Sequence, residues 1–362
     1  MAGLYIHIPF CKSRCIYCGF YSTTSLDMRQ QYVDALCREM EIRPRNSIET
    51  IYLGGGTPSQ LSTDQIRQLF IYINKVYDPR ATEITIEMNP DDVTPEYADA
   101  LCQLGINRVS MGAQTFDDRR LRFLHRRHAA AQVRQAVDIL RTVGIANISV
   151  DLMYGFPSET LDDWESDINA ALSLDVEHIS AYCLMIEEGT VLHRLGVDAA
   201  DEETERQMYE RLIDRLTIAG YEHYEISNFA RPGRRSRHNS NYWTGVPYIG
   251  LGAAAHSFDG NQRNWNTADL RTYIAAIDCG HRPCEVEVLT PRDRYNEHVM
   301  LALRTADGLP LNVLSDTDRR HCMQEAQPFL NDGMLRLQNH RLVLTRKGLF
   351  VSDYVISSLM QA

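Results

Sequence analysis

The sequence predicts an α/β fold: a partial (β/α)6 barrel followed by a small, winged-helix-like C-terminal domain. Short β-rich runs alternate with amphipathic helical stretches six times between residues 4 and 184, a pattern typical of parallel β-α units. Residues able to do chemistry fall at the carboxyl ends of successive predicted strands, where barrel enzymes place their sites. An open doubly wound sheet is the alternative, although it brings ligands only to its switch point.

Each element has a local signal in the sequence. The six predicted strands are LYIHIPF, TIYLGGG, TEITIEMNP, NRVSMGAQ, ISVDLMYG and HISAYCL. Helices are expected between them because apolar residues recur at helical spacing, as at Tyr32, Leu36 and Met40. Ser62 with Gln65, and Thr160 with Asp163, are spaced like capping boxes that start helices. Residues 291–305 read as a helix, and residues 333–356 as two short strands followed by a helix.

Composition and charge restrict the class of partner. The chain has 362 residues, 44% hydrophobic and 23% charged, which is ordinary usage for a globular protein. Its formal net charge of -11 argues against nucleic acid as the main partner and against a polybasic membrane anchor. One basic stretch, RPGRRSRH at residues 231–238, departs from this trend and is interpreted as a solvated loop or as an anion contact.

Cysteine usage predicts a reducing compartment. The chain contains nine cysteines, and its first residues, MAGLYIHIPF, lack the features of a secretory signal. No apolar run approaches the roughly 18 residues of a membrane span. We therefore expect a cytoplasmic protein whose clustered cysteines bind metal or take part in redox chemistry.

Three of these cysteines form a compact group, CKSRCIYC, in the loop after the first strand. Three thiolates from Cys11, Cys15 and Cys18 leave one corner of a four-iron cluster without a protein ligand. A structural zinc site normally closes with four ligands, and His7 is the candidate for the fourth. Phe20 cannot ligate a metal. An iron–sulfur cluster is favoured, and zinc is the alternative.

The cysteine spacing resembles the C-x3-C-x2-C signature of the radical S-adenosylmethionine (SAM) superfamily. The motifs YIHIPFCKSRCIYCGF, LGGGTPS, IEMNP, SMGAQTF, VDLMYGFP and HNSNYW follow in the order of one family within it. This family contains oxygen-independent coproporphyrinogen III oxidase and the HemW-type haem chaperone, and the resemblance covers nearly the whole chain. It implies a radical SAM partial barrel.

The resemblance also implies roles for individual residues. The three cysteines would hold a [4Fe-4S] cluster, and SAM would occupy its open iron. Expected to bind or line the cofactor site are Tyr5, Tyr17, Gly55, Gly56, Thr57 and Glu87. Gln114, Arg126 and Asp151 align with positions that contact a second SAM in the oxidase. The local alternatives are an ordinary tight turn for the glycines, a solvated Glu87, an exposed basic turn for Arg126 and a loop cap for Asp151.

Two features separate the oxidase from the chaperone. The oxidase pattern has a further cysteine where this sequence has Phe20, and an extension ahead of its first strand, whereas four residues precede Tyr5 here. The HNxxYW motif of the haem chaperones is present as His238, Tyr242 and Trp243. The imidazole is expected to ligate haem iron and the rings to flank the macrocycle, with nearby arginines pairing with propionates. The alternative is core packing with a satisfied histidine.

The expected organisation is a barrel over 1–225, a bridging segment with the haem motif over 226–290 and a C-terminal domain over 291–362 that covers the barrel mouth. The favoured function is a chaperone that delivers haem to an acceptor haemoprotein, with peripheral contact to a membrane-bound acceptor and no nucleic acid. The alternatives are the oxidase, another radical SAM enzyme acting on a tetrapyrrole and, less favoured, a SAM-dependent enzyme that degrades haem.

Overall fold

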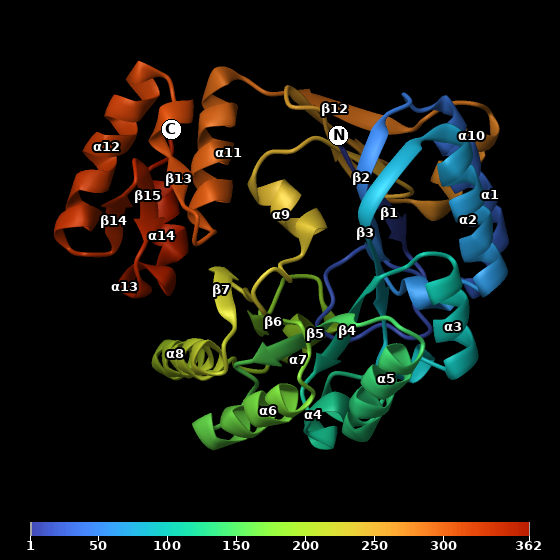
Figure 1. Ribbon diagram of the computed structural model, residues 1–362, viewed down its shortest axis with the longest axis horizontal. Coiled ribbons are helices and arrows are strands. Elements are labelled where there is room, and N and C mark those ends of the chain that lie inside the picture. The colour runs from blue at the N-terminus through green and yellow to red at the C-terminus, as the bar shows by residue number, and fades with distance from the viewer. Residues whose placement is uncertain (1, 362) are drawn as a thin grey trace.

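The computed structural model describes residues 2–361 and contains a curled twelve-stranded sheet, helices on its outer face and a separate C-terminal domain (Figure 1). Strand order in the large sheet is β12-β11-β10-β9-β1-β2-β3-β4-β5-β6-β8-β7. Met1 and Ala362, which the predicted domain boundaries include, lie outside the described residues.

The six predicted strands form the centre of this sheet, in sequence order and parallel throughout. They are β1 (Ala2–Ile8), β2 (Ser47–Gly55), β3 (Asp78–Met88), β4 (Arg108–Gln114), β5 (Asn147–Tyr154) and β6 (His178–Cys183). Because all six point the same way, their carboxyl ends meet at one edge of the curled sheet. The predicted α/β partial barrel is confirmed.

Six further strands lengthen the sheet at both edges. β7 (Glu222–Glu225) and β8 (Asn228–Ala230) follow β6, while β9 (Tyr248–Leu251) pairs parallel with β1. β10 (His256–Phe258), β11 (Gln262–Asn266) and β12 (Cys284–Val288) continue antiparallel beyond β9. Residues 226–290, predicted as a bridging segment, therefore supply strands to both edges of the barrel sheet.

Helices cover the outer face of the barrel sheet. They are α1 (Arg29–Ile42), α2 (Thr63–Val76), α3 (Pro95–Gln103), α4 (Asp118–Phe123), α5 (Ala130–Thr142), α6 (Leu161–Ser173), α8 (Glu202–Ile218) and α10 (Leu270–Asp278). The short α7 (Val191–Leu195) instead packs Leu192 against Ile16 of the cysteine loop. The capping boxes predicted at Ser62 and at Thr160 are both formed, with Gln65 and Asp163 as partners. Within residues 2–361, no helix has the length and apolar character to cross a bilayer.

The main core lies between the sheet and these helices. Side chains alternate along β1, so Leu4, Ile6 and Ile8 pack outward among the helices while Tyr5 and His7 point into the barrel. The barrel interior is thus lined by polar and aromatic residues, whereas the apolar residues are buried on the outside. This division leaves the interior available for a site.

The C-terminal domain has a core of its own. It comprises α11 (Pro291–Leu303), α12 (Asp316–Asn331), α13 (Arg346–Leu349), α14 (Ser352–Ser358) and a three-stranded sheet of β13 (Leu309–Pro310), β14 (Leu335–Gln338) and β15 (Arg341–Leu344). Its buried apolar residues, among them Val299, Phe329 and Leu342, form a cluster separate from the barrel core. The helices and hairpin agree with the predicted winged arrangement.

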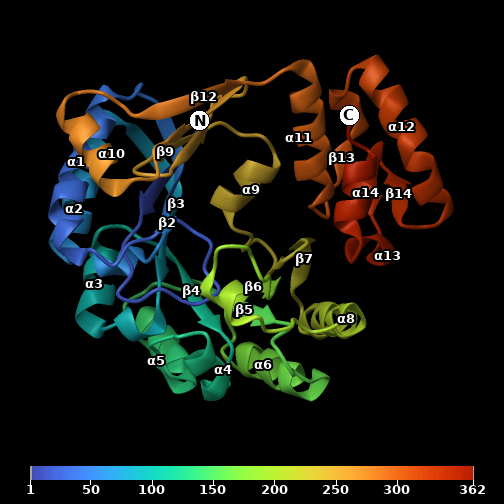
Figure 2. The ribbon, with the colours of Figure 1, turned by 180° about the vertical axis from the view of Figure 1, so that it is seen from behind.

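This domain lies at the gap between the two edges of the curled sheet. On α11, Glu297 pairs with Arg263 of β11 at 2.7 Å, and Thr305 just beyond α11 bridges to Glu225 of β7. α11 and the residues just after it therefore contact strands near both edges of the curled sheet, and α9 (Arg237–Trp243) lies between these edges (Figures 1 and 2). The cavity at the mouth is lined by residues 11–187, to which the C-terminal domain contributes none, and covering of the mouth by this domain stays a prediction.

Docking of the domain depends on the buried carboxylate of Glu225. It accepts hydrogen bonds from Arg304 Nε and Nη2, at 3.1 and 2.9 Å, and from Asn228 Nδ2. Glu225→Ala is expected to lower the free energy of unfolding by about 1–3 kcal/mol, because these donors lose their partner away from water. Urea denaturation measures this. The exposed Glu222→Ala is the control, and equal effects of the two substitutions contradict the assignment.

Candidate functional site at the barrel mouth

A cavity of about 660 Å³ opens at the carboxyl ends of the parallel strands. Eleven of the fifteen residues predicted from the sequence line it. They are Cys11, Cys15, Tyr17, Cys18, Gly55, Gly56, Thr57, Glu87, Gln114, Arg126 and Asp151. They come from the cysteine loop, from the carboxyl-terminal parts of β2 to β5 and, for Arg126, from the segment between α4 and α5, so the predicted convergence on one mouth is present in the structure.

The cysteine loop is fixed by backbone hydrogen bonds and by one buried side chain. The Cys11 N–H donates to the Thr23 carbonyl at 2.9 Å, which closes the base of the loop. Ile16 is buried in a small apolar cluster with Leu124 and Phe156, on the barrel side of the loop. The thiols on either side of Ile16 are thereby held at the cavity wall.

The thiols form a donor set for a cluster rather than for one ion. Burial raises the pKa of the Cys11 and Cys18 thiols, and the neighbouring Cys15 raises both further. A bound cation would have to displace their protons. Within residues 2–361, no group of three His, Cys, Asp or Glu side chains converges on a single metal position. Three separate thiols facing one cavity fit a multi-iron cluster, in which each thiolate binds a different iron.

His7, the candidate fourth ligand of the zinc alternative, is bonded at both ring nitrogens. Nε2 lies 3.1 Å from the Tyr21 carbonyl, which only accepts, so Nε2 carries the proton. Nδ1 therefore accepts from the Tyr5 hydroxyl, also at 3.1 Å. Burial lowers the pKa of His7 to about 4, so the ring is neutral at pH 7. Its lone pair is engaged by Tyr5, which lies behind the cavity rather than in its lining.

The glycine turn after β2 is explained first by packing. Gly55 has φ +112°, and a Cβ there would lie 2.5 Å from the His7 ring. A Cβ on Gly56 would lie 2.8 Å from the backbone of Pro9. Both positions therefore require glycine for close approach of β1 and β2, as the tight-turn interpretation holds. They also line the cavity beside Thr57, whose hydroxyl lies 3.5 Å from Cys11 Sγ.

Glu87 supplies an acceptor near the floor of the cavity. Its carboxylate accepts from the Tyr52 hydroxyl at 2.7 Å and from the Gly55 N–H at 3.0 Å. Burial raises the pKa of Glu87 to about 7, although both hydrogen bonds favour the charged form. Its charge therefore changes near neutral pH, and the solvated alternative does not describe it.

Arg126 lies against the cysteine loop. Its Nη2 donates to Asn89 Oδ1 at 2.7 Å and to the Gly112 carbonyl at 2.5 Å, while Nη1 lies 3.6 Å from Cys15 Sγ. Its Nε is buried without a hydrogen-bond partner. The exposed-turn alternative is therefore wrong for Arg126. Asn89, which orients it, was not predicted as a site residue, although it follows Glu87 by two positions at the same strand end.

Gln114 and Asp151 complete the wall opposite the cysteine loop. Gln114 has φ +66°, a left-handed conformation at the end of β4 that is uncommon for residues with a side chain. Asp151 is buried, which raises its pKa, and it accepts from the Ser110 hydroxyl at 3.3 Å. Ser110 also lines the cavity. It was not predicted as a site residue, although it begins the SMGAQTF motif that carries the family resemblance.

The three residues of the HNxxYW motif lie on α9, away from this cavity. His238 is 1% exposed, with Nδ1 2.8 Å from Thr50 Oγ1 and Nε2 2.8 Å from the Tyr242 hydroxyl. Its ring stacks on Tyr52 with centroids 5.1 Å apart, and burial lowers its pKa to about 3. Both ring nitrogens of His238 are hydrogen-bonded, as in the alternative interpretation of a satisfied histidine, so neither is open for the ligation of haem iron expected from the motif.

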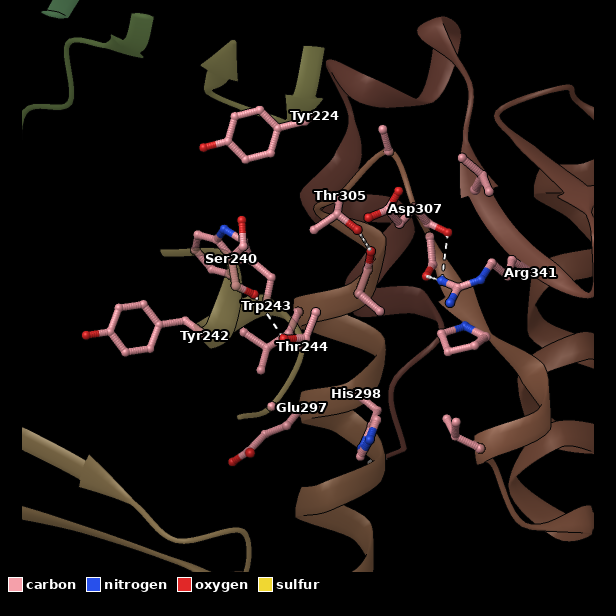
Figure 3. Close-up of a pocket in the computed structure, with 18 of the residues that line it drawn as sticks. Tyr224, Ser240, Tyr242, Trp243, Thr244, Glu297, His298, Thr305, Asp307 and Arg341 are labelled. Carbon is pink, nitrogen blue, oxygen red and sulfur yellow. Dashed lines mark hydrogen bonds between the residues drawn. The ribbon is translucent and has the colours of Figure 1, made fainter. Parts of the chain in front are cut away.

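Tyr242 and Trp243 line a second cavity, of about 980 Å³, between α9, the β9–β11 edge and the C-terminal domain (Figure 3). Tyr242 packs edge-on against Tyr248, with ring centroids 4.7 Å apart. The Arg304 guanidinium lies 5.2 Å from the centroid of Trp243, whose Nε1 is buried without a partner. The motif thus joins the barrel interior to this second cavity.

Comparisons with known proteins agree with the geometry. Residues 5–171 match the radical SAM superfamily and residues 289–351 match the HemN C-terminal domain. The chain is 34% identical to the haem chaperone HemW of Bacillus subtilis, with 99% of each chain covered. It is also 34% identical to the haem chaperone HemW of Mycobacterium tuberculosis, covering 99% of this chain and 94% of the other.

Coproporphyrinogen III oxidase (HemN) of Escherichia coli has a similar fold. Its structure matches with a TM-score of 0.86 at 22% identity, covering 99% of this chain and 90% of that one. This likeness supports the arrangement of the barrel and the C-terminal domain. At such identity it describes the fold alone.

Burial of neutral His238 has a consequence for stability. Its pKa is about 3 when folded and about 6.5 when unfolded, so the unfolded chain binds an extra proton between these values. Its contribution is present above pH 6.5 and is lost as pH falls toward 3. Between pH 6 and 4 the free energy of unfolding of the wild type should therefore decrease as the pH falls. His238→Gln should reduce this slope by about 1.4 kcal/mol per pH unit. Urea denaturation at several pH values measures it, with exposed His281→Gln as the control, and unchanged slopes contradict it.

Proposed function

Because the chain belongs to the radical SAM superfamily and, within it, to the family of the haem chaperone HemW, we propose that it binds haem and delivers it to an acceptor haemoprotein. A [4Fe-4S] cluster and SAM act in this function as resident cofactors. The observation that carries the proposal is the presence, in one chain, of a mouth cavity with three thiols and a second cavity with aromatic and cationic walls.

The residues at the mouth fit the two cofactors. Cys11, Cys15 and Cys18 would hold the cluster, and their cavity has room beside it for a ligand of the size of SAM. When bound, the cluster supplies a one-electron donor next to a sulfonium. Glu87 provides an acceptor for hydroxyl or ammonium groups, and Arg126 provides a cation that can face a carboxylate.

The second cavity would hold the haem. Tyr242 and Trp243 offer flat faces to a macrocycle, and arginines around them can pair with propionates. His238 positions Tyr242 through its 2.8 Å hydrogen bond rather than reaching the cavity itself. The acceptor, including one at a membrane surface, would then approach from outside this cavity.

One anaerobic experiment tests the function. Reconstituted protein is incubated with SAM, a reductant and either haem with an apo-haemoprotein or coproporphyrinogen III. We expect haem to appear in the acceptor and no decarboxylated porphyrinogen. Formation of that product would establish the oxidase alternative instead.

Cys15→Ser should lose cluster iron and sulfide, whereas Cys279→Ser, at an exposed cysteine, should retain both.

SAM binding should depend on pH through Glu87. Its pKa of about 7 means that the carboxylate is mostly protonated at pH 6 and ionised at pH 8. If Glu87 accepts from SAM, the affinity for SAM rises with pH across this range by about tenfold and levels off above it. Isothermal titration at pH 6 and 8 measures the change.

Two variants isolate this effect. Glu87→Gln should give a flat pH profile. Glu159→Gln is the matched control, since burial also raises the pKa of Glu159 to about 7 but its side chain lies outside the cavity lining. A flat profile in the wild type, or a lost dependence in Glu159→Gln, would remove Glu87 from the SAM site.

A further inference from the structure

The second cavity is positively charged in an acidic protein. Its lining contains five arginines and two carboxylates, whereas the whole chain has a net charge of -11. Both carboxylates are already paired: Glu297 with Arg263 at 2.7 Å, and Asp307 with Arg235 at 3.3 Å. Within residues 2–361, the other three arginines of the lining have no carboxylate partner. They are Arg294, Arg336 and Arg341. The cavity therefore suits an anion.

The walls of the cavity differ in character. Tyr242 and Trp243 of α9 lie on one side, and Arg341 of β15 lies on the other, with α11 between them (Figure 3). Arg341 donates Nη1 to the carbonyls of Asp307 and Gly308, both at 2.9 Å, which fixes the guanidinium while leaving its other N–H groups available. An apolar planar ligand with an anionic end matches aromatic faces opposite a cationic edge.

His298 of α11 also lines the cavity, between Trp243 on one side and Arg341 on the other (Figure 3). Its Nδ1 lies 2.9 Å from the Arg294 carbonyl of the preceding turn. A carbonyl only accepts, so Nδ1 carries the proton and Nε2 keeps the lone pair. Metal-binding histidines are commonly oriented in this way, with one ring N–H donated to a backbone carbonyl. Within residues 2–361, no hydrogen bond engages Nε2 of this exposed side chain.

His238 is the opposite case. Its Nδ1 and Nε2 both have hydrogen-bond partners, and it is enclosed by Thr50, Tyr52 and Tyr242. Iron would have to displace a tyrosine and enter the barrel core to reach it. The HNxxYW motif contains His238, but His298 is the histidine whose imidazole is accessible from the cavity that Tyr242 lines.

We propose that Nε2 of His298 is the axial ligand of haem iron in the second cavity, with Arg336 and Arg341 binding the propionates. This inference rests on the proposed function and deepens it, since it names the ligand by which haem is held. The bond is a simple coordination of a neutral imidazole to iron, so it needs no redox partner and no proton transfer.

Two probes separate the iron bond from the other contacts. Haemin carries iron, whereas protoporphyrin IX has the same ring and propionates without metal. His298→Ala should weaken haemin binding about tenfold or more and change its absorption spectrum, while protoporphyrin IX binding stays unchanged. Added imidazole should restore the haemin spectrum. Arg341→Gln should weaken the binding of both porphyrins, because it removes a propionate contact.

Matched variants define the outcomes. His281→Ala, at an exposed histidine outside the cavity lining, should bind haemin as the wild type does. A His298→Ala protein with wild-type haemin affinity and spectrum overturns the assignment, and does so most clearly if His238→Ala alters both. If the wild type itself fails to bind haemin, the proposed function fails instead. Urea denaturation of each variant confirms that the comparison is made between folded proteins.

Discussion

The buried carboxylate of Glu83 fixes α9, on which the relation between the two cavities depends. Glu83 is 4% exposed, and its oxygens accept the backbone N–H groups of Arg237 and His238, each at 2.9 Å. A carboxylate is stabilising there because the first N–H groups of a helix lack partners and carry a partial positive charge. Glu83 precedes Glu87 by four residues on β3, so α9 meets the strand about 13 Å from the mouth.

A continuous line of contacts crosses from one cavity to the other. The Tyr52 hydroxyl donates to Glu87 in the mouth cavity, the Tyr52 ring stacks on His238, and His238 bonds Tyr242 in the lining of the second cavity. Contact alone does not amount to coupling. Coupling requires two discrete positions of Tyr242, one bonded to His238 and one released, with a ligand in either cavity favouring one of them. The hydrogen bond from His238 to Tyr242 thus positions a residue of the second cavity although His238 itself does not line that cavity.

Local signals made the barrel and its mouth predictable from sequence. The capping boxes at Ser62 and Thr160 and the alternation along each strand act over a few residues, and parallel strands bring their ends together without further information. The second cavity had no such signal, because its lining runs from Tyr224 to Val343 and joins three separate parts of the chain. The position of the C-terminal domain had no local signal for the same reason, since it depends on pairs such as Arg304 with Glu225.

The separation of the cavities bears on whether a bound tetrapyrrole is cargo or substrate. Chemistry on a ligand requires its reacting atom to lie within about 3–3.5 Å of the attacking group. A macrocycle beside Tyr242 is separated from the mouth cavity by the rings of Tyr52 and His238, both of which are packed. Groups held by the cysteine loop therefore cannot reach it unless α9 leaves its place on Glu83. Under the proposed function, a ligand held there would be carried and released intact, as a chaperone requires, while the mouth cavity would be left to its own cofactors.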